Sequence, residues 1–89
     1  MHFVYILRSD KDGELYTGYT TNIRQRVTDH NRGHVPSTAR RVPLHLIFFE
    51  CYSNKDDAVR REMYLKTSAG KKAIKFILRT TLAERSVCS

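Results

Sequence analysis

The sequence is short of cysteines and acidic side chains and has no long apolar segment, and each shortage excludes a class of protein. Its two cysteines, Cys51 and Cys88, have neither the spacing of a zinc knuckle nor the density of a disulfide-rich scaffold. No apolar run approaches the roughly 18 residues that a membrane-spanning helix needs. The first residues follow a strand pattern and not that of a secretory leader, so we expect a cytoplasmic protein without a membrane partner.

Acidic residues are outnumbered by basic ones, because the chain has 16 Lys and Arg against nine Asp and Glu, a net charge of +7. Such an imbalance favours polyanionic partners, most often nucleic acid. With 89 residues, of which 40% are hydrophobic, the chain fits one folded domain and has no room for a second. We expect that domain over residues 1–79 and a C-terminal tail over residues 80–89, in which Leu82 and Val87 are able to dock.

Hydrophobic periodicity predicts three strands and three helices. The strands are expected at 3–7, 15–20 and 44–52, with an Asp-Gly turn that makes a hairpin of the first two. The helices are expected at 22–32, from 55 to about 66, and then from Ser68 or Gly70 to about 79, with capping side chains at Asn22 and in the pair Ser53-Asn54. Between the first helix and the third strand lies a basic loop. The order β-β-α-β-α-α predicts an α+β fold, a small sheet flanked by helices.

Two polar residues lie beside the apolar stripe of the first helix. Ile23 and Val27 define this stripe, and helical spacing brings Arg26 and His30 next to it. An arginine can also extend to solvent over its apolar stem, and a histidine at a helix end can bond a carbonyl. Four residues apart, the two side chains can instead converge on one ligand. His30 and His34 have a zinc-like spacing, but no third ligand is near and zinc is not expected.

Glu62 falls on the apolar side of the second predicted helix. That side is set by Ala58, Val59, Met63 and Leu65. A buried carboxylate without a partner would cost several kcal/mol or become protonated, so Glu62 should meet an arginine, a lysine or a metal ion. An ion pair with Arg26 and a metal ion are both open at this point.

Two tyrosines and a glycine stand out on the predicted hairpin. Tyr5 and Tyr16 point to the same face if the register places them opposite or diagonal, although either can be an ordinary packing residue. Gly18 removes a side chain inside a strand, which weakens the strand unless something must approach the backbone closely.

The order and spacing of these residues resemble those of the GIY-YIG nuclease superfamily. The first motif reads Phe3-Val4-Tyr5 here and the second Tyr16-Thr17-Gly18, followed by Arg26 with His30 and then by Glu62. Residues 16–31 are most similar to the small stand-alone single-domain bacterial branch. The resemblance covers about residues 1–78, and the first motif departs from the family's Gly-Ile at Phe3-Val4.

The resemblance implies a phosphodiester hydrolase with a three-stranded antiparallel sheet that depends on one divalent ion, Mg²⁺ or Mn²⁺. The family's catalytic positions fall on Tyr5, Tyr16, Arg26 and His30, its metal ligand on Glu62 and its close backbone approach on Gly18. A single carboxylate predicts weak metal binding without substrate. Because a phenol is almost wholly protonated at neutral pH, Tyr5 needs either a pKa lowered by Arg26 and the metal or a relay through His30. We expect Tyr5 to face the attacking water, with Tyr16 orienting water or phosphate.

The expected substrate is nucleic acid, DNA more than RNA, recognised by its structure in a setting such as DNA repair. The residues expected to contact phosphates are Arg40, Arg41, Lys66, Lys71, Lys72, Lys75 and Arg79. Many family members use a separate DNA-binding domain, so a protein partner is expected to supply specificity here. The alternatives are a non-catalytic nucleic-acid-binding module of the same fold and a scaffold for an acidic protein.

Overall fold

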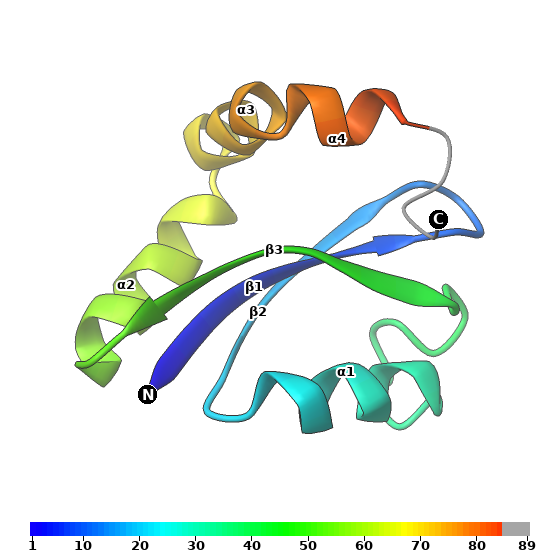
Figure 1. Cartoon of the computed structure of the whole chain (residues 1–89), viewed down its shortest axis with the longest axis horizontal. Helices are drawn as coiled ribbons and strands as arrows, with labels where there is room; N and C mark the ends of the chain where they lie inside the picture. The colour runs from blue at the N-terminus through cyan, green and yellow to red at the C-terminus, as the bar shows by residue number, and fades with distance from the viewer. Residues whose placement is uncertain (85–89) are drawn as a thin grey trace.

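A computed structural model describes residues 1–84 as one small sheet with helices on both faces (Figure 1). The elements are β1 (His2–Ser9), β2 (Leu15–Thr20), α1 (Ile23–Asn31), β3 (Leu44–Tyr52), α2 (Lys55–Leu65), α3 (Ser68–Ile77) and α4 (Arg79–Ala83). The strands are antiparallel in the order β2-β1-β3. The predicted α+β fold with a three-stranded antiparallel sheet is therefore confirmed.

The β1–β2 hairpin follows from the polar turn between its strands. The Ser9 hydroxyl accepts hydrogen bonds from the Lys11 and Asp12 amides, and the Asp12 carboxylate accepts one from the Glu14 amide. Gly13 has φ = 72°, a left-handed conformation that glycine adopts without strain. The turn therefore fixes the register that aligns the two motif strands.

The central strand β1 is buried on both faces, as its unbroken apolar sequence predicts. Val4 and Ile6 face a core built with α2, α3 and α4, whereas Tyr5 and Leu7 face a second cluster built with α1 and the start of β3. In Figure 1, α1 lies on one side of the sheet, and α3 and α4 lie on the other. Alternate residues of β1 thus separate a purely apolar core from a face that carries polar groups.

Side-chain caps start three of the helices. Asn22 accepts a hydrogen bond from the Gln25 amide at α1, Asn54 accepts one from the Asp56 amide at α2, and Thr67 accepts one from the Gly70 amide at α3. The cap expected at Asn22 is confirmed, and in the pair Ser53-Asn54 it is Asn54 that caps α2. Gly70 leaves room for the end of α2, because a Cβ there would lie 2.6 Å from the Leu65 Cα.

Two details of the helices differ from the sequence expectation. Met63 and Ile77, expected on apolar inner faces, are 65% and 49% exposed, because each helix buries a narrower stripe than its apolar composition suggests. The segment expected to be a tail begins with α4, and Leu82 packs against the core as expected. Val87 and Cys88 lie outside the described residues. Over residues 1–84, no helix is both long and apolar enough to cross a membrane.

Candidate active site

Four of the predicted residues meet on the sheet face that α1 covers. Tyr5 and Tyr16 extend from β1 and β2, and Arg26 and His30 extend from α1. Tyr5 lies opposite Gly18 in the strand register, so Tyr16, two residues away, is its diagonal neighbour. The ring centroids of the two tyrosines are 6.3 Å apart, and that of Tyr16 is 4.9 Å from that of His30. The prediction that the phenols share a face is confirmed.

A chain of hydrogen bonds runs through the buried centre of this group. The Tyr5 hydroxyl is 3.0 Å from His30 Nε2, and His30 Nδ1 is 2.6 Å from the Thr38 hydroxyl. Thr38 in turn donates to the Val35 carbonyl at 3.4 Å. His30 and Thr38 are completely buried, and only 1% of Tyr5 is exposed. The imidazole is therefore held at both nitrogens.

The direction of these bonds follows from the donor inventory. A hydroxyl has one proton, so Thr38, which donates to a carbonyl, accepts from His30 Nδ1. Nε2 of the neutral imidazole then carries no proton and accepts the Tyr5 hydroxyl. The phenol proton thus already points at a basic nitrogen.

Arg26 lies one helical turn before His30 and contacts the same phenol. Its Nε donates to the Tyr5 oxygen at 3.4 Å. The hydrogen bond to Tyr5, together with the field of Tyr5 and Tyr16, raises the pKa of the guanidinium further. The cation therefore lies against both phenols, where an incoming phosphate would find a fixed positive charge.

Burial sets the proton affinities of the pair. It raises the pKa of Tyr5, and the opposing hydrogen bond from Arg26 does not reverse that shift. Burial also lowers the pKa of His30, and the neighbouring Arg26 charge lowers it further. Both groups are therefore neutral at pH 7. Arg26 by itself does not give Tyr5 a lowered pKa, and the relay through His30 is the route that the geometry offers.

Gly18 is explained by the Tyr5 ring. A Cβ at Gly18 would lie 2.5 Å from Tyr5 Cζ, closer than any side chain tolerates. The close approach predicted at Gly18 is thus that of the Tyr5 phenol to the strand backbone. This packing also leaves Tyr5 more enclosed than a water-facing group was expected to be, whereas Tyr16 is half-buried.

Glu62 lies on α2, on the same side as the buried Ala58 and Leu65, with 19% of its side chain exposed. Its carboxylate forms an ion pair with the Lys66 ammonium, one turn along the helix, at a distance of 3.0 Å. Of the partners expected for Glu62, an arginine, a lysine or a metal ion, the structure provides a lysine, and the specific pair with Arg26 is not formed. The negative charge also helps to raise the pKa of Tyr5, so it reaches the buried phenol electrostatically.

These donors fit a weakly bound Mg²⁺ ion and not a tightly held one. In residues 1–84, no group of three or more His, Cys, Asp and Glu side chains is placed to hold a metal. Mg²⁺ retains several waters and often takes only one or two carboxylates, with substrate oxygens completing its shell. Glu62 is partly exposed, and Lys66, half exposed on a flexible stem, can move aside. One carboxylate of this kind is compatible with an ion that arrives together with a phosphate.

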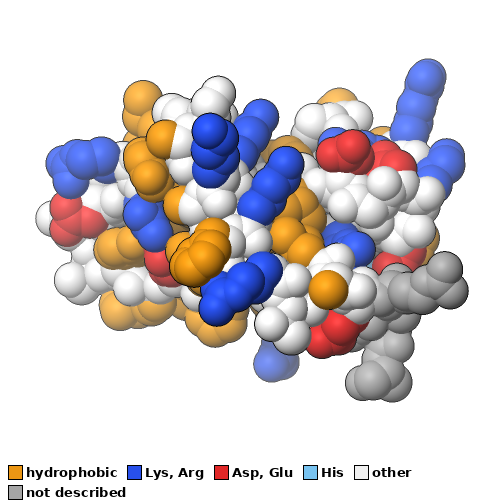
Figure 2. Space-filling view, turned by 90° about the horizontal axis from the view of Figure 1, so that it is seen from above, with side chains coloured by type: hydrophobic (Ala, Val, Ile, Leu, Met, Phe, Trp, Pro, Cys, Tyr) orange, Lys and Arg blue, Asp and Glu red, His pale blue; other side chains and the backbone are white. Residues whose placement is uncertain are grey.

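The predicted phosphate-binding residues do not form one uniform group. Arg41 pairs with Asp12 at 3.3 Å, Lys66 pairs with Glu62, and the Arg79 guanidinium lies 4.3 Å over the Phe76 ring. The remaining members, Arg40, Lys71, Lys72 and Lys75, are exposed. Figure 2 views the molecule from the side of α3 and α4, and Lys and Arg side chains extend across that face with hydrophobic groups between them.

Two residues that hold this site together were not singled out in the sequence. Thr38 lies in the loop between α1 and β3, where no period marks it, yet it fixes the His30 tautomer. Asn31 donates to the Leu44 carbonyl at 2.9 Å and accepts from the Leu44 amide at 2.7 Å. Both act across the loop, so a local sequence pattern contains no signal for either.

Comparisons with known proteins agree with this geometry. The family model described as the GIY-YIG catalytic domain matches residues 1–75. UPF0213 proteins of Staphylococcus aureus and Staphylococcus haemolyticus are 43% identical over 77 residues, which cover 85% of this chain and 93% of each relative. The solution NMR structure of a UPF0213 protein from Bacillus halodurans is 35% identical, with a TM-score of 0.55, and the match covers 97% of this chain and 93% of that one.

Proposed function

The chain belongs to the GIY-YIG family, whose fold is of the nuclease type, and on that premise we propose that it hydrolyses phosphodiester bonds of structured DNA in a divalent-metal-dependent reaction. The observation that carries the proposal is the buried chain from Tyr5 through His30 to Thr38, with Arg26 against the phenol. A histidine and a tyrosine with completely satisfied, oriented hydrogen bonds are pre-arranged for proton transfer.

In the proposed reaction, the oxygen of a water molecule bonds to phosphorus, the bond from phosphorus to one sugar oxygen breaks, and a proton of the water passes to the Tyr5 oxygen. The Tyr5 hydroxyl proton moves in the same step to His30 Nε2, 3.0 Å away. The imidazolium that results keeps its bond from Nδ1 to Thr38. Tyr5 therefore stays neutral throughout, and its raised pKa is no obstacle.

Arg26 and Tyr16 deal with the phosphate in this scheme. The guanidinium holds a non-bridging oxygen and offsets the charge that develops on it, which a planar fork does better than an ammonium. Tyr16, on the more open side of the pair, orients the water or the phosphate. The field of Arg26 also keeps His30 neutral at pH 7, ready to accept a proton.

Glu62 would hold the Mg²⁺ or Mn²⁺ ion, which supplies stabilisation of the leaving oxygen when it is bound. The Lys66 ammonium neutralises the carboxylate until then. The approach of a polyanion would attract Lys66 away and leave Glu62 to the metal. This chain thus avoids an unpaired carboxylate near its substrate face.

The test is a cleavage assay with Mg²⁺ or Mn²⁺ over a panel of duplexes, flaps, branched junctions, single strands and RNAs. We expect cleavage of at least one structured DNA and its loss in Glu62→Gln. Lys66→Gln is the matched control, because it breaks the same ion pair but keeps the carboxylate, and it should still cleave. If no substrate is cleaved under either metal, or if Glu62→Gln cleaves like the wild type, the proposal is wrong.

One observation favours a second candidate, a non-catalytic module that only binds nucleic acid. Glu62 would repel phosphate, but its ion pair with Lys66 removes most of that repulsion and so makes a binding role compatible with its presence. The two candidates differ in the effect of Tyr5→Phe. In a nuclease this variant should reduce cleavage by about 10²- to 10⁴-fold without changing affinity. In a binding module no cleavage is expected from the wild type or the variant, and the affinity should again be unchanged.

A further inference from the structure

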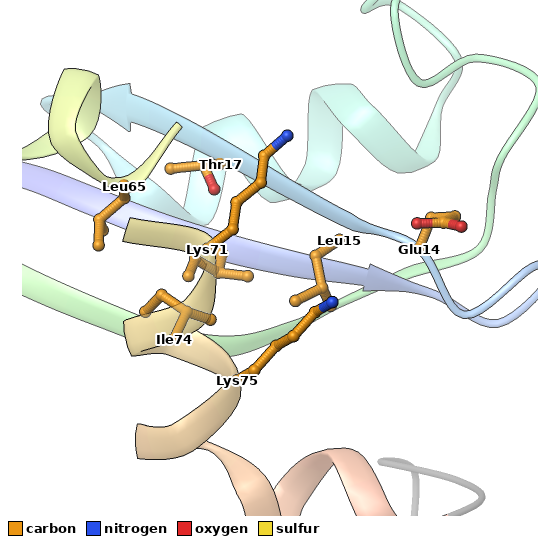
Figure 3. Close-up of a pocket in the computed structure, with 8 residues that line it drawn as sticks. Glu14, Leu15, Thr17, Leu65, Lys71, Ile74 and Lys75 are labelled. Carbon is orange, nitrogen blue, oxygen red and sulfur yellow. The ribbon is translucent and has the colours of Figure 1, made fainter. Parts of the chain in front are cut away.

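A pocket of about 190 Å³ lies between β2 and α3, on the sheet face opposite the candidate active site (Figure 3). It is lined by Ile6, Glu14, Leu15, Thr17, Leu65, Lys71, Ile74 and Lys75. None of these residues belongs to the catalytic set. The pocket therefore needs an explanation of its own.

The pocket has an apolar floor and a positively charged rim. Ile6, Leu65 and Ile74 are almost completely buried and belong to the core. Lys71 and Lys75 are exposed, and in Figure 3 both side chains extend from α3 toward the sheet, with Lys71 passing beside Thr17 and Lys75 ending beside Leu15. An occupant would accordingly have a flat or compact apolar part attached to an anionic group.

Its position connects it with the candidate active site along the edge strand β2. Thr17 directly follows Tyr16 and precedes Gly18, and strand residues rise by about 3.3 Å each. On α2, the pocket residue Leu65 lies less than one turn from Glu62. The pocket thus shares the edge strand β2 with Tyr16 and the helix α2 with Glu62, although it opens on the other face of the sheet.

We propose that this pocket binds an unpaired nucleobase of the substrate strand, with Lys71 and Lys75 on the adjoining phosphates. The inference rests on the proposed function and narrows its substrate class to nucleic acid with an unpaired nucleotide. A base inside a duplex cannot reach an enclosed pocket, whereas an extruded or single-stranded base can. Sites that bind an unpaired base commonly place apolar side chains against the base and positively charged side chains against the adjoining phosphates.

The polar wall residues add a preference among bases. Glu14 supplies a carboxylate that accepts hydrogen bonds from exocyclic amino groups, which cytosine and adenine carry and thymine lacks. The Thr17 hydroxyl both donates and accepts. We therefore expect adenine and cytosine to be bound in preference to thymine, and Glu14→Gln to weaken this preference.

Methyl NMR on the Glu62→Gln protein without metal tests the pocket independently of catalysis. The probes are a five-nucleotide single strand of deoxyadenosine and a strand of the same length and phosphate count whose central nucleotide is abasic. We expect the adenine strand to shift the methyl resonances of Ile6, Leu15, Leu65 and Ile74. The abasic strand should bind about tenfold more weakly and leave those methyls in place.

Variants separate the base from its phosphates. Leu15→Phe fills the pocket and should remove the difference between the two strands, with Thr17→Val as a second, isosteric change that reduces it. Lys71→Gln and Lys75→Gln should each lower the affinity for the adenine strand and for the abasic strand. Arg60→Gln is the matched control, because Arg60 already pairs with Asp57 and does not line the pocket, so its loss should leave the affinity for both strands unchanged.

The outcomes distinguish this inference from the nuclease proposal. Equal methyl shifts with the abasic strand, or shifts confined to Ile23 and Val27 on the α1 face, would overturn the pocket proposal even if the protein cleaves DNA. Base-dependent shifts in a protein that cleaves nothing would support the pocket and sink the nuclease proposal alone.

Discussion

The Tyr5 hydroxyl oxygen is in contact with three residues. It donates to His30, accepts from Arg26, and lies over the bare backbone of Gly18. Each neighbour has a different part: in the proposed reaction His30 would take the proton, while Arg26 supplies positive charge and Gly18 provides space. Substitutions at these positions should therefore have distinct signatures.

Tyr5→Phe should reduce single-turnover cleavage by about 10²- to 10⁴-fold, the usual contribution of a general acid–base group. It also leaves the buried His30 Nε2 without a partner, at a cost of about 1–3 kcal/mol in stability. Affinity for nucleic acid should not change. Tyr16→Phe is the comparison: near-normal cleavage by Tyr5→Phe beside an inactive Tyr16→Phe would exchange the two roles.

His30 should make the free energy of unfolding depend on pH. Its folded pKa lies below the ordinary value of about 6.5, so the unfolded chain binds the proton more tightly. The stabilising contribution is complete above about pH 6.5 and is lost as the pH falls through the folded pKa. Thermal unfolding of wild type and His30→Gln between pH 4.5 and 8 measures it. Parallel curves for the two proteins would contradict the buried neutral imidazole.

Cleavage should follow the same titration, because only neutral His30 can accept the phenol proton. We expect the single-turnover rate constant of cleavage to be near its maximum at pH 7 and to fall as the pH is lowered below about 6.5. His30→Gln should lose most of the activity, and the rate that remains should no longer fall as the pH is lowered through this range. An unchanged acid limb in that variant would assign it to another group.

Gly18→Ala should destabilise the fold and impair cleavage, because the new methyl overlaps the Tyr5 ring and the ring cannot move without losing His30. The expected cost is about 1–3 kcal/mol, typical of overpacking. In a Tyr5→Ala background the overlap is absent, so adding Gly18→Ala there should lower the free energy of unfolding by only a few tenths of the amount lost in the wild type. Equal costs in both backgrounds would show that the strand itself, and not Tyr5, requires glycine.

At the scale of elements, α1 and the loop that follows it form one functional unit. The helix carries Arg26 and His30, whereas the loop returns Thr38 to the imidazole and then leads into β3. Gly33, at φ = 77°, ends the helix and turns the chain back. The two bonds between Asn31 and Leu44 close the base of this loop.

Asn31→Ala should therefore loosen the loop and not only the helix. It leaves the Leu44 amide and carbonyl unpaired, at a cost of about 1–3 kcal/mol. Amide hydrogen exchange over residues 33–43 should accelerate, and cleavage should fall as Thr38 loses its position. Asn22→Ala, which removes the N-cap of the same helix at about 1 kcal/mol, is the control and should leave exchange in the loop unchanged.

At the scale of the whole molecule, the charge of +7 is the dominant feature. The acidic residues are used locally, since Asp12, Glu62 and Asp57 each neutralise one basic side chain. The lysines of α3 extend over one exposed face. An electropositive surface of this kind binds phosphates through release of counterions.

The affinity for DNA should consequently fall steeply as salt increases. Lys75→Gln should weaken binding and reduce the slope of log K against log[salt] by about one unit, the share of one phosphate contact. Arg60→Gln is the control, because Arg60 already pairs with Asp57 at 3.0 Å and should contribute little to the slope. Fluorescence anisotropy between 50 and 300 mM salt measures both. Equal slopes for the two variants would place the nucleic acid away from α3.

The positions of the three strands, the capping side chains at Asn22 and at Ser53-Asn54, and the order of the elements along the chain could all be predicted from the sequence, as could the shared face of Tyr5 and Tyr16 once the hairpin register is given. All of these depend on residues within a few positions of one another or on the two-residue period of a strand. The tertiary structure decided which partner each polar group has. Glu62 took Lys66 instead of Arg26, Thr38 was recruited from a loop without periodicity, and the pocket beside β2 was formed by residues from four elements. The physical reason is that hydrogen bonds and burial depend on separations of a few ångströms in space, which a one-dimensional pattern does not specify for residues far apart in the chain.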